Sequence, residues 1–334
     1  MAVAICKYLK SSVLVVVLAI LSGSMPVPAQ ATGSFGDWGD DHVGKSTPDY
    51  VTGDECLFCH REKVGNVWGK NLHNRSMRNV LGVSPTFKAL LEAAGVSEIA
   101  SESTYILGRR DELRFLKPNG KYGQFSIHST RLTAKEEGGF EKVNAGAAHW
   151  DEDAFANSCI GCHTTSIDLE YKSFEAPSLD CMVCHGDVPQ GHQNEPAQAL
   201  FAKKARNSVL VEMSICGQCH LRGGKSKSSG LPYPNSFVGG DNLFKDLDVD
   251  FSEERIAGMN IADRHVYRNV KDVIVSGLNE MVCTTCHDVH GESSRRHRVL
   301  KRIERDSYCM ICHSDKSDYT KVYSYEVHND VCDY

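Results

Sequence analysis

The sequence predicts a mainly α-helical protein with extensive loops and one small β-hairpin near residues 104–127. Apolar residues follow helical spacing over 84–94 and over 252–276, and we expect a break within the second stretch. The alternation that is typical of strands occurs only in the hairpin stretch. Short cysteine motifs recur at uneven intervals along the 334 residues, which excludes a simple tandem repeat.

The hairpin is predicted from strand-like stretches at 104–107, 112–116 and 122–127, with the turn Pro118-Asn119-Gly120 between the last two. Residues 222–240 combine glycine pairs with serines, lysines and two prolines. This composition predicts a loop and the one candidate domain boundary in the chain.

The first 31 residues have the layout of a secretory signal peptide. Two lysines precede an apolar run over 13–21, and Ala29-Gln30-Ala31 is a small-residue cleavage site. The run is shorter than the roughly 20 residues that span a bilayer, and no later stretch is long and apolar enough to do so. We therefore expect residues 32–334 to act without a transmembrane segment, in the periplasm or at the cell exterior.

Composition excludes several classes of protein. The formal net charge is −6, which argues against a nucleic-acid partner because such a protein would need a basic face. Hydrophobic residues make up 41% of the chain, so a disordered or fibrous chain is not expected.

Twelve of the 14 cysteines lie in six copies of Cys-x-x-Cys-His. The cysteines of the motifs are Cys56, Cys59, Cys159, Cys162, Cys181, Cys184, Cys216, Cys219, Cys283, Cys286, Cys309 and Cys312. Their histidines are His60, His163, His185, His220, His287 and His313. The two other cysteines are Cys6, in the signal peptide, and Cys332.

The histidine after each cysteine pair indicates the chemistry. A Cys-x-x-Cys pair alone could form a redox disulfide or bind zinc, but zinc needs no histidine after every pair. In Cys-x-x-Cys-His both sulfurs bond to a haem, and the histidine reaches its iron as the proximal ligand. The sequence therefore predicts six covalently bound haem c groups in one hexahaem domain. With about 50 residues per haem, stacked haems would organise the fold and supply its core, so the apo-chain should fail to fold.

Nine histidines remain as candidates for the sixth coordination position of the irons. His290 is three residues after His287, so the two cannot bind opposite faces of one iron, and His290 would serve a neighbouring haem. The same reasoning applies to His192, which follows His185 by seven residues. Methionine is the alternative ligand and would raise the reduction potential.

Several segments together resemble one superfamily of multihaem cytochromes. These are Trp68 to Met77, His149-Trp150 before the second motif, the third motif followed by Gly191-His192, the fourth motif with Leu221-Arg222-Gly223, and the fifth with His290-Gly291. They resemble the superfamily that contains the tetrahaem cytochrome of nitrifying bacteria and hydroxylamine oxidoreductase, here as a six-haem member. The resemblance implies the distal ligands His73, His149, His192, His265, His290 and His328. It leaves His42, His128 and His297 without a role.

That superfamily includes electron carriers and enzymes, so fold does not decide the function. We expect an electron carrier with bis-histidine haems that works between respiratory partners, either quinol-linked proteins or other cytochromes. The first alternative is an oxidoreductase that acts on a small nitrogen or sulfur compound at a five-coordinate haem. No motif ends in lysine, as the catalytic motif of ammonia-forming nitrite reductases often does, and we predict no catalytic residue.

The second alternative is a subunit of an extracellular conducting filament. An acidic segment near the start of the mature chain and the basic stretch Arg295–Arg305 would make complementary ends for self-association.

Overall fold

The computed structural model describes residues 39–108, 112–144, 146–189, 191–196, 199–201, 209–275 and 282–292. Several features predicted from the sequence lie outside these residues: the signal peptide at 1–31, the sixth motif from Cys309 to His313, the histidines His297 and His328, and Cys332.

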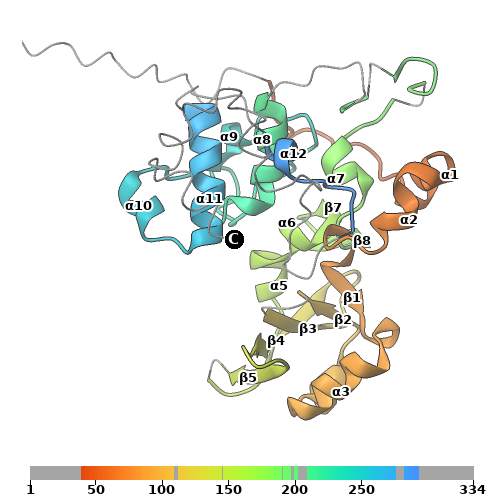
Figure 1. Cartoon of the computed structure of the whole chain (residues 1–334), viewed down its shortest axis with the longest axis vertical. Coiled ribbons are helices and arrows are strands. Elements are labelled where there is room, and N and C mark those ends of the chain that lie inside the picture. Colours follow the sequence, from red (N-terminus) through yellow and green to blue (C-terminus); the bar gives the residue numbers. More distant parts are fainter. Residues whose placement is uncertain are drawn as a thin grey trace, which may run out of the picture. The chain divides into compact units, whose positions relative to one another are not determined.

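A six-stranded antiparallel sheet is built from the chain between the first and second motifs (Figure 1). Its strands are β1 (Met77–Asn79), β2 (Tyr105–Leu107), β3 (Glu112–Pro118), β4 (Phe125–Ala134), β5 (Phe140–Asn144) and β6 (Trp150–Asp151). Neighbours follow the order β1-β2-β3-β4-β5, and β6 pairs with β4. The predicted hairpin lies within this sheet, but the mainly α-helical class predicted from the sequence is wrong. The described chain mixes helices with antiparallel sheets.

The central strand β3 buries side chains on both of its faces. On β3, Leu113 and Phe115 belong to one cluster of buried side chains, whereas Leu116 belongs to another together with its β4 partner Ile127. All four are at most 1% exposed. A strand covered on both sides reads as a run of apolar residues, which resembles a buried helix in sequence.

Two helices, α3 (Pro85–Ala93) and α4 (Ser97–Glu102), contribute to the first of these clusters. The helix predicted over 84–94 is confirmed. Ser84 caps α3 through its side chain, which accepts a hydrogen bond from the backbone N–H of Phe87 at 3.2 Å, and Pro85 occupies the first helical position. Leu91, Val96 and Ala100 carry the apolar contact between these helices and the sheet.

The second cluster includes residues of α5 (Ala154–Ser158) and α6 (Ile160–His163), which holds the second motif apart from its first cysteine. Phe155 and Ile160 pack there with Tyr233, whose hydroxyl donates a hydrogen bond to the carbonyl of Ala156. The loop predicted at 222–240 therefore reaches the second motif, and its role as a domain boundary stays a prediction.

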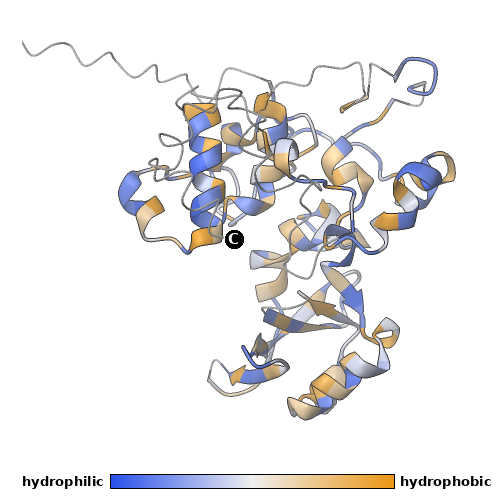
Figure 2. Ribbon diagram, in the orientation of Figure 1, coloured by the Kyte–Doolittle hydropathy of each residue, from blue (hydrophilic) through white to orange (hydrophobic). Residues whose placement is uncertain are grey.

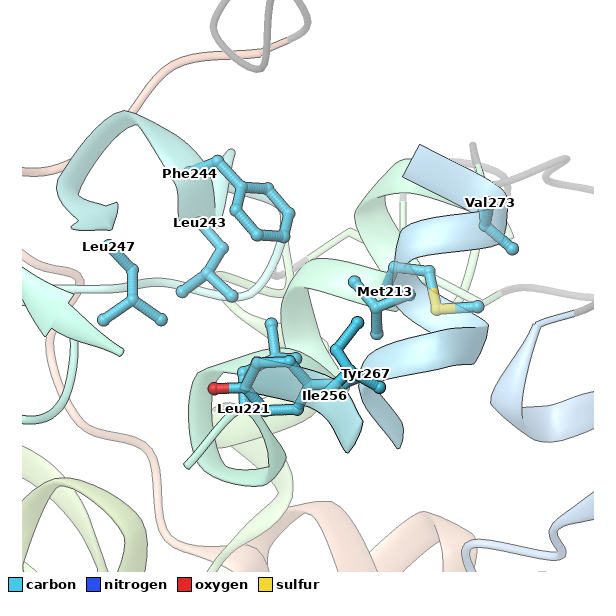
Figure 3. Close-up of a cluster of buried hydrophobic side chains, with 9 residues drawn as sticks. Met213, Leu221, Leu243, Phe244, Leu247, Ile256, Tyr267 and Val273 are labelled. Atoms are coloured by element: carbon cyan, nitrogen blue, oxygen red, sulfur yellow. The ribbon is translucent and has the colours of Figure 1, made fainter. Parts of the chain in front are cut away.

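A third cluster joins helices from the later part of the chain (Figure 3). They are α8 (Val209–His220), α9 (Leu243–Asp246), α10 (Glu253–Ala257), α11 (Ile261–Val270) and the π-helical turn η5 (Lys271–Val275). The predicted helix over 252–276 breaks between α10 and α11, where Asn260 caps α11 by accepting hydrogen bonds from two backbone N–H groups. Hydrophilic and hydrophobic residues both occur on α11 (Figure 2), and Tyr267 and Val270 are its buried residues.

The remaining elements are short. The helices and turns are α1 (Gly53–His60), η1 (Arg61–Gly65), α2 (Asn66–Trp68), η2 (His73–Arg75), η3 (Val80–Gly82), α7 (Cys181–His185) and α12 (Cys283–Cys286). The strands are β7 (Thr164–Asp168), which pairs with β8 (Ser173–Pro177), and β9 (Lys225–Ser226), which pairs with β10 (Leu247–Asp248). Within the described residues, no helix is both long and apolar enough to cross a membrane.

Part of the chain has side-chain cores of its own, whereas some of the motif helices bury almost nothing. The three clusters consist of packed apolar side chains, so the expectation that stacked haems would supply the core is too broad. In contrast, Gly53 is the one buried residue of α1, and neither α7 nor α12, both fully described, contains a buried residue. Haem would supply buried surface at these helices rather than throughout the chain.

Candidate haem sites

Five of the six motifs lie within the described residues, each on or beside a short helix. The first motif ends α1, the second runs into α6, the third forms α7, the fourth is the last turn of α8, and the fifth begins with α12. Each helix fixes the direction of both cysteines relative to the following histidine.

The first and third motifs share one carboxylate, that of Asp180. Its Oδ2 accepts hydrogen bonds from the hydroxyl of Tyr50 and the backbone N–H of Gly53, both at 2.7 Å, and its Oδ1 accepts from the backbone N–H of Cys181 at 2.8 Å. The thiols of Cys56 and Cys181 are neighbours that affect each other's ionisation. Asp180 thus joins the N-termini of α1 and α7 and holds the two motifs side by side.

The fourth motif adjoins three others. The sulfur of Cys162 in the second motif lies 3.9 Å from the carbonyl oxygen of Gln218. The Gln218 amide donates a hydrogen bond to the carbonyl of Val183 in the third motif at 3.4 Å. On α8, Glu212 accepts a hydrogen bond from the backbone N–H of Thr284 in the fifth motif at 2.8 Å. The described motifs are therefore packed in a different order from their order in the sequence.

Three motif histidines each face a histidine from elsewhere in the chain. The ring centroids are separated by 6.3 Å for His60 and His192, 6.0 Å for His185 and His290, and 6.2 Å for His73 and His220. The ring planes of the three pairs meet at 19°, 4° and 88°, respectively.

This separation fits one metal ion between two imidazoles. An imidazole nitrogen binds a first-row metal at about 2.0–2.1 Å and the ring centroid lies about 1.1 Å behind it, so two rings on opposite sides of one ion would be about 6.2 Å apart. Packed aromatic rings have centroids about 4.5–7 Å apart, so the assignment also uses the fact that each pair joins a motif histidine to a histidine elsewhere in the chain. The three pairs thus fit bis-histidine ligation of a haem iron.

Two of these histidines are oriented by hydrogen bonds from the other ring nitrogen. Nδ1 of His192 donates to the carbonyl of Pro189 at 2.9 Å, and Nδ1 of His185 donates to the carbonyl of Leu200 at 3.3 Å. Such bonds fix the tautomer and direct Nε2 toward a metal, as they do for metal-binding histidines in general.

Burial keeps several of the rings in the form that binds metals. Burial, together with the nearby His73, lowers the pKa of His220 to about 4. Burial likewise lowers the pKa of His73 and of His185. Ligation requires the neutral imidazole, so these three rings are prepared for it at neutral pH.

Among the described residues, the motif cysteines form no disulfide. No group of three or more Cys, His, Asp or Glu side chains within the described residues is arranged to hold a metal ion. Burial raises the pKa of the Cys159 and Cys184 thiols to about 11, whereas a hydrogen bond with a neighbouring cysteine lowers the pKa of Cys162 and of Cys283.

Comparison with known proteins gives one similar structure. The chain is similar to the undecaheme cytochrome from the S-layer of Carboxydothermus ferrireducens, with 17% sequence identity and a TM-score of 0.44. The similarity covers 81% of this chain and 44% of the other, so the chain spans less than half the length of that protein. No family model and no curated protein sequence matches the chain.

The other histidines expected as distal ligands are placed differently. His149 is exposed, and its Nδ1 donates to the carbonyl of Ala147 at 2.8 Å. His265 lies on α11 beside the amide of Asn269. Their assignments stay predictions, as does that of His328. Within the described residues no histidine ring faces His163 of the second motif, while the nearby His287 of the fifth motif helps to lower the pKa of His73.

Two of the histidines to which the sequence assigned no role, His42 and His128, make structural contacts. His42 bonds to both carboxylate oxygens of Asp241 at 2.8 Å, which ties the start of the described chain to the loop before α9. His128 is 5% exposed on β4, where its ring packs edge-on against Trp150.

Sequence reasoning missed Asp180 and Glu212, the two carboxylates that link motifs. Asp180 immediately precedes Cys181 as the N-cap of α7, so an aspartate before a motif helix was the available signal. Glu212 has no such signal, because its contact with Thr284 spans 72 residues.

The contact at Asp180 leads to a stability prediction. A Cβ atom at Gly53 would overlap the Asp180 carboxylate, so Gly53→Ala should separate the first and third motifs and reduce the free energy of unfolding by about 1–3 kcal/mol. Thermal unfolding of the haem-containing protein measures this. Gly69→Ala is the matched control, since a Cβ there meets nothing within 4 Å. Equal stability of the two variants would show that the Asp180 contact does not hold the motifs together.

Proposed function

We propose that the chain is an exported hexahaem c-type cytochrome that carries electrons through closely spaced bis-histidine haems. The observation that carries this proposal is the set of three histidine pairs with centroid separations of 6.0–6.3 Å, each joining a motif histidine to a distant one. Packed aromatic rings also occur at this separation, as for Trp68 and His290 at 6.2 Å, so the weight of the proposal lies on each pair joining a motif histidine to a histidine from a distant segment.

Each group of residues has a separate task in this proposal. The cysteines would attach each haem covalently, and the two imidazoles of a pair would both bind its iron, which would limit structural change between the oxidised and reduced forms. When bound, haem supplies an iron that alternates between the ferric and ferrous states. The carbonyls of Pro189 and Leu200 orient two of the imidazoles, so the protein fixes the ligands before and after each electron moves.

The contacts between motifs suggest the path. The first motif adjoins the third through Asp180, the third adjoins the fourth through Gln218, and the fourth also adjoins the second and the fifth. Electrons would therefore pass between the first and fourth sites by way of the third, with the second and fifth as branches. We propose redox proteins as donor and acceptor, in the periplasm or at the cell exterior.

Haem stoichiometry tests the proposal. The mass of the intact protein and its alkaline pyridine haemochrome spectrum should give six covalently bound haems on a chain that begins after the signal peptide. A chain with no covalent haem, or with zinc in the motifs, would contradict it.

An oxidoreductase is the second candidate, and it would need at least one haem with an open coordination position. Cyanide or nitric oxide added to the oxidised and reduced protein tests this. Binding at one haem, with turnover of hydroxylamine, nitrite or sulfite, would favour the enzyme. Absence of both would favour the carrier.

A further inference from the structure

A buried amide connects the segment after the first motif to the segment after the fifth. Asn71 is fully buried, with 0% of its surface exposed. Its Nδ2 donates to the carbonyls of Val289 and Gly291 at 2.9 and 2.7 Å, and its Oδ1 accepts from the backbone N–H of His73 at 2.9 Å. One side chain therefore holds the residues on both sides of His290 and also the backbone of His73.

These three hydrogen bonds use both N–H donors and the carbonyl oxygen of the Asn71 side chain. An asparagine amide has two N–H donors and one carbonyl oxygen, and each donor here meets a different carbonyl while the oxygen meets an N–H. No other side chain of similar size offers two donors and an acceptor in this geometry. Aspartate keeps the acceptor and loses the donors, and leucine loses both.

The histidines that Asn71 holds belong to two different pairs. His290 faces His185 with nearly parallel rings at 4°, and His73 faces His220 with nearly perpendicular rings at 88°. Trp68, three residues before Asn71 and 8% exposed, adds an edge contact to the His290 ring at 6.2 Å between centroids. The same short segment thus positions the non-motif histidine of both the third and the fourth sites.

We infer that Asn71 is a positioning residue that sets the orientation of the distal ligands His73 and His290 at two adjacent haem sites. This inference rests on the proposed function. It adds that the two sites share one structural determinant, so loss of all three bonds alters the ligand geometry of both, whereas a substitution that keeps the acceptor alters only that of His290.

Electron paramagnetic resonance of the oxidised protein reports the angle between axial imidazole planes. Parallel planes split the two iron d orbitals that interact with the rings and give a rhombic low-spin signal. Perpendicular planes leave these orbitals nearly degenerate and give a strongly anisotropic signal with a large maximum g value. The His185–His290 and His73–His220 pairs are thus distinguishable, and His290→Ala identifies the rhombic signal of the former.

The test compares two variants of the haem-containing protein. In Asn71→Asp the carboxylate still accepts from the His73 N–H, but it has no N–H to donate to the carbonyls of Val289 and Gly291. This variant should shift or remove the rhombic signal that His290→Ala removes and leave the strongly anisotropic signal unchanged. Asn71→Leu removes all three bonds and should alter both signals.

Lys70→Ala is the control, because it removes the exposed ion pair of Lys70 with Glu292 at 3.3 Å, which ties the same two segments at the surface. It should leave both signals unchanged. Unaltered spectra in both Asn71 variants would overturn the inference while the low-spin spectrum of the wild type upheld the proposed function. Loss of all haem signals in both variants would make Asn71 a general folding residue and would also overturn it. A wild-type spectrum without low-spin haem would instead refute the proposed function.

Discussion

Replacing His192 or His290 with alanine should convert one haem from low-spin to high-spin and raise its reduction potential. Each of these rings faces a motif histidine at the separation expected for a shared metal, His60 and His185, respectively. Alanine removes the nitrogen donor on one side, and loss of a strong donor destabilises the ferric state. A redox titration followed in the visible region, with an electron paramagnetic resonance spectrum of the oxidised form, measures both effects.

His42→Ala is the matched control for these variants. Its ring binds Asp241 rather than facing a motif histidine, so its loss should leave every haem low-spin. The pairing would be wrong if His290→Ala left the spectrum unchanged, or if His42→Ala produced the same high-spin signal.

Preventing haem attachment should unfold the motif-bearing helices and spare the sheet. The sheet buries Ile106, Leu113 and Phe115 completely against α3 and α4. By contrast, α7 and α12, as described, bury no residue, and helices shorter than about 12–15 residues are marginal in isolation. In the apo-chain, hydrogen exchange should therefore stay slow in β2, β3 and β4 and become fast in α1, α7 and α12.

The holo-protein under the same conditions is the control, and there α1, α7 and α12 should exchange slowly. An apo-chain with the exchange pattern of the holo-protein, or with one cooperative unfolding transition of the whole chain, would show that haem does not supply the missing buried surface. Fast exchange in the sheet as well would restore the broader expectation from the sequence, that the apo-chain does not fold at all.

The sheet was hard to predict because its polar residues have partners that only the fold reveals. The strand predicted from the sequence ends at residue 127, whereas β4 continues to Ala134. His128 is buried against Trp150 of β6, and the hydroxyl of Thr130 donates to the side chain of Asn144 on β5 at 2.6 Å. Very short strands such as β6 leave no alternation to detect.

The candidate sites depend on local sequence more than the fold does. The motif supplies its own ligands at fixed spacing, so its chemistry is local and can be read from the sequence. Chain geometry alone also predicted that His290 and His192 would serve other motifs, and their rings face His185 and His60. The identity of each partner depended on contacts between distant segments. The bonds of Asn71 to Val289 and Gly291, more than 200 residues away, could not be anticipated from spacing.

The central claim is that histidine pairs hold the irons of several haems from both sides. The most direct measurement is an electron paramagnetic resonance spectrum of the oxidised wild-type protein, quantified against its total haem. The account predicts low-spin signals that include rhombic components from the two pairs with nearly parallel rings and a strongly anisotropic component from the perpendicular pair, His73 with His220. A spectrum dominated by high-spin haem would contradict it.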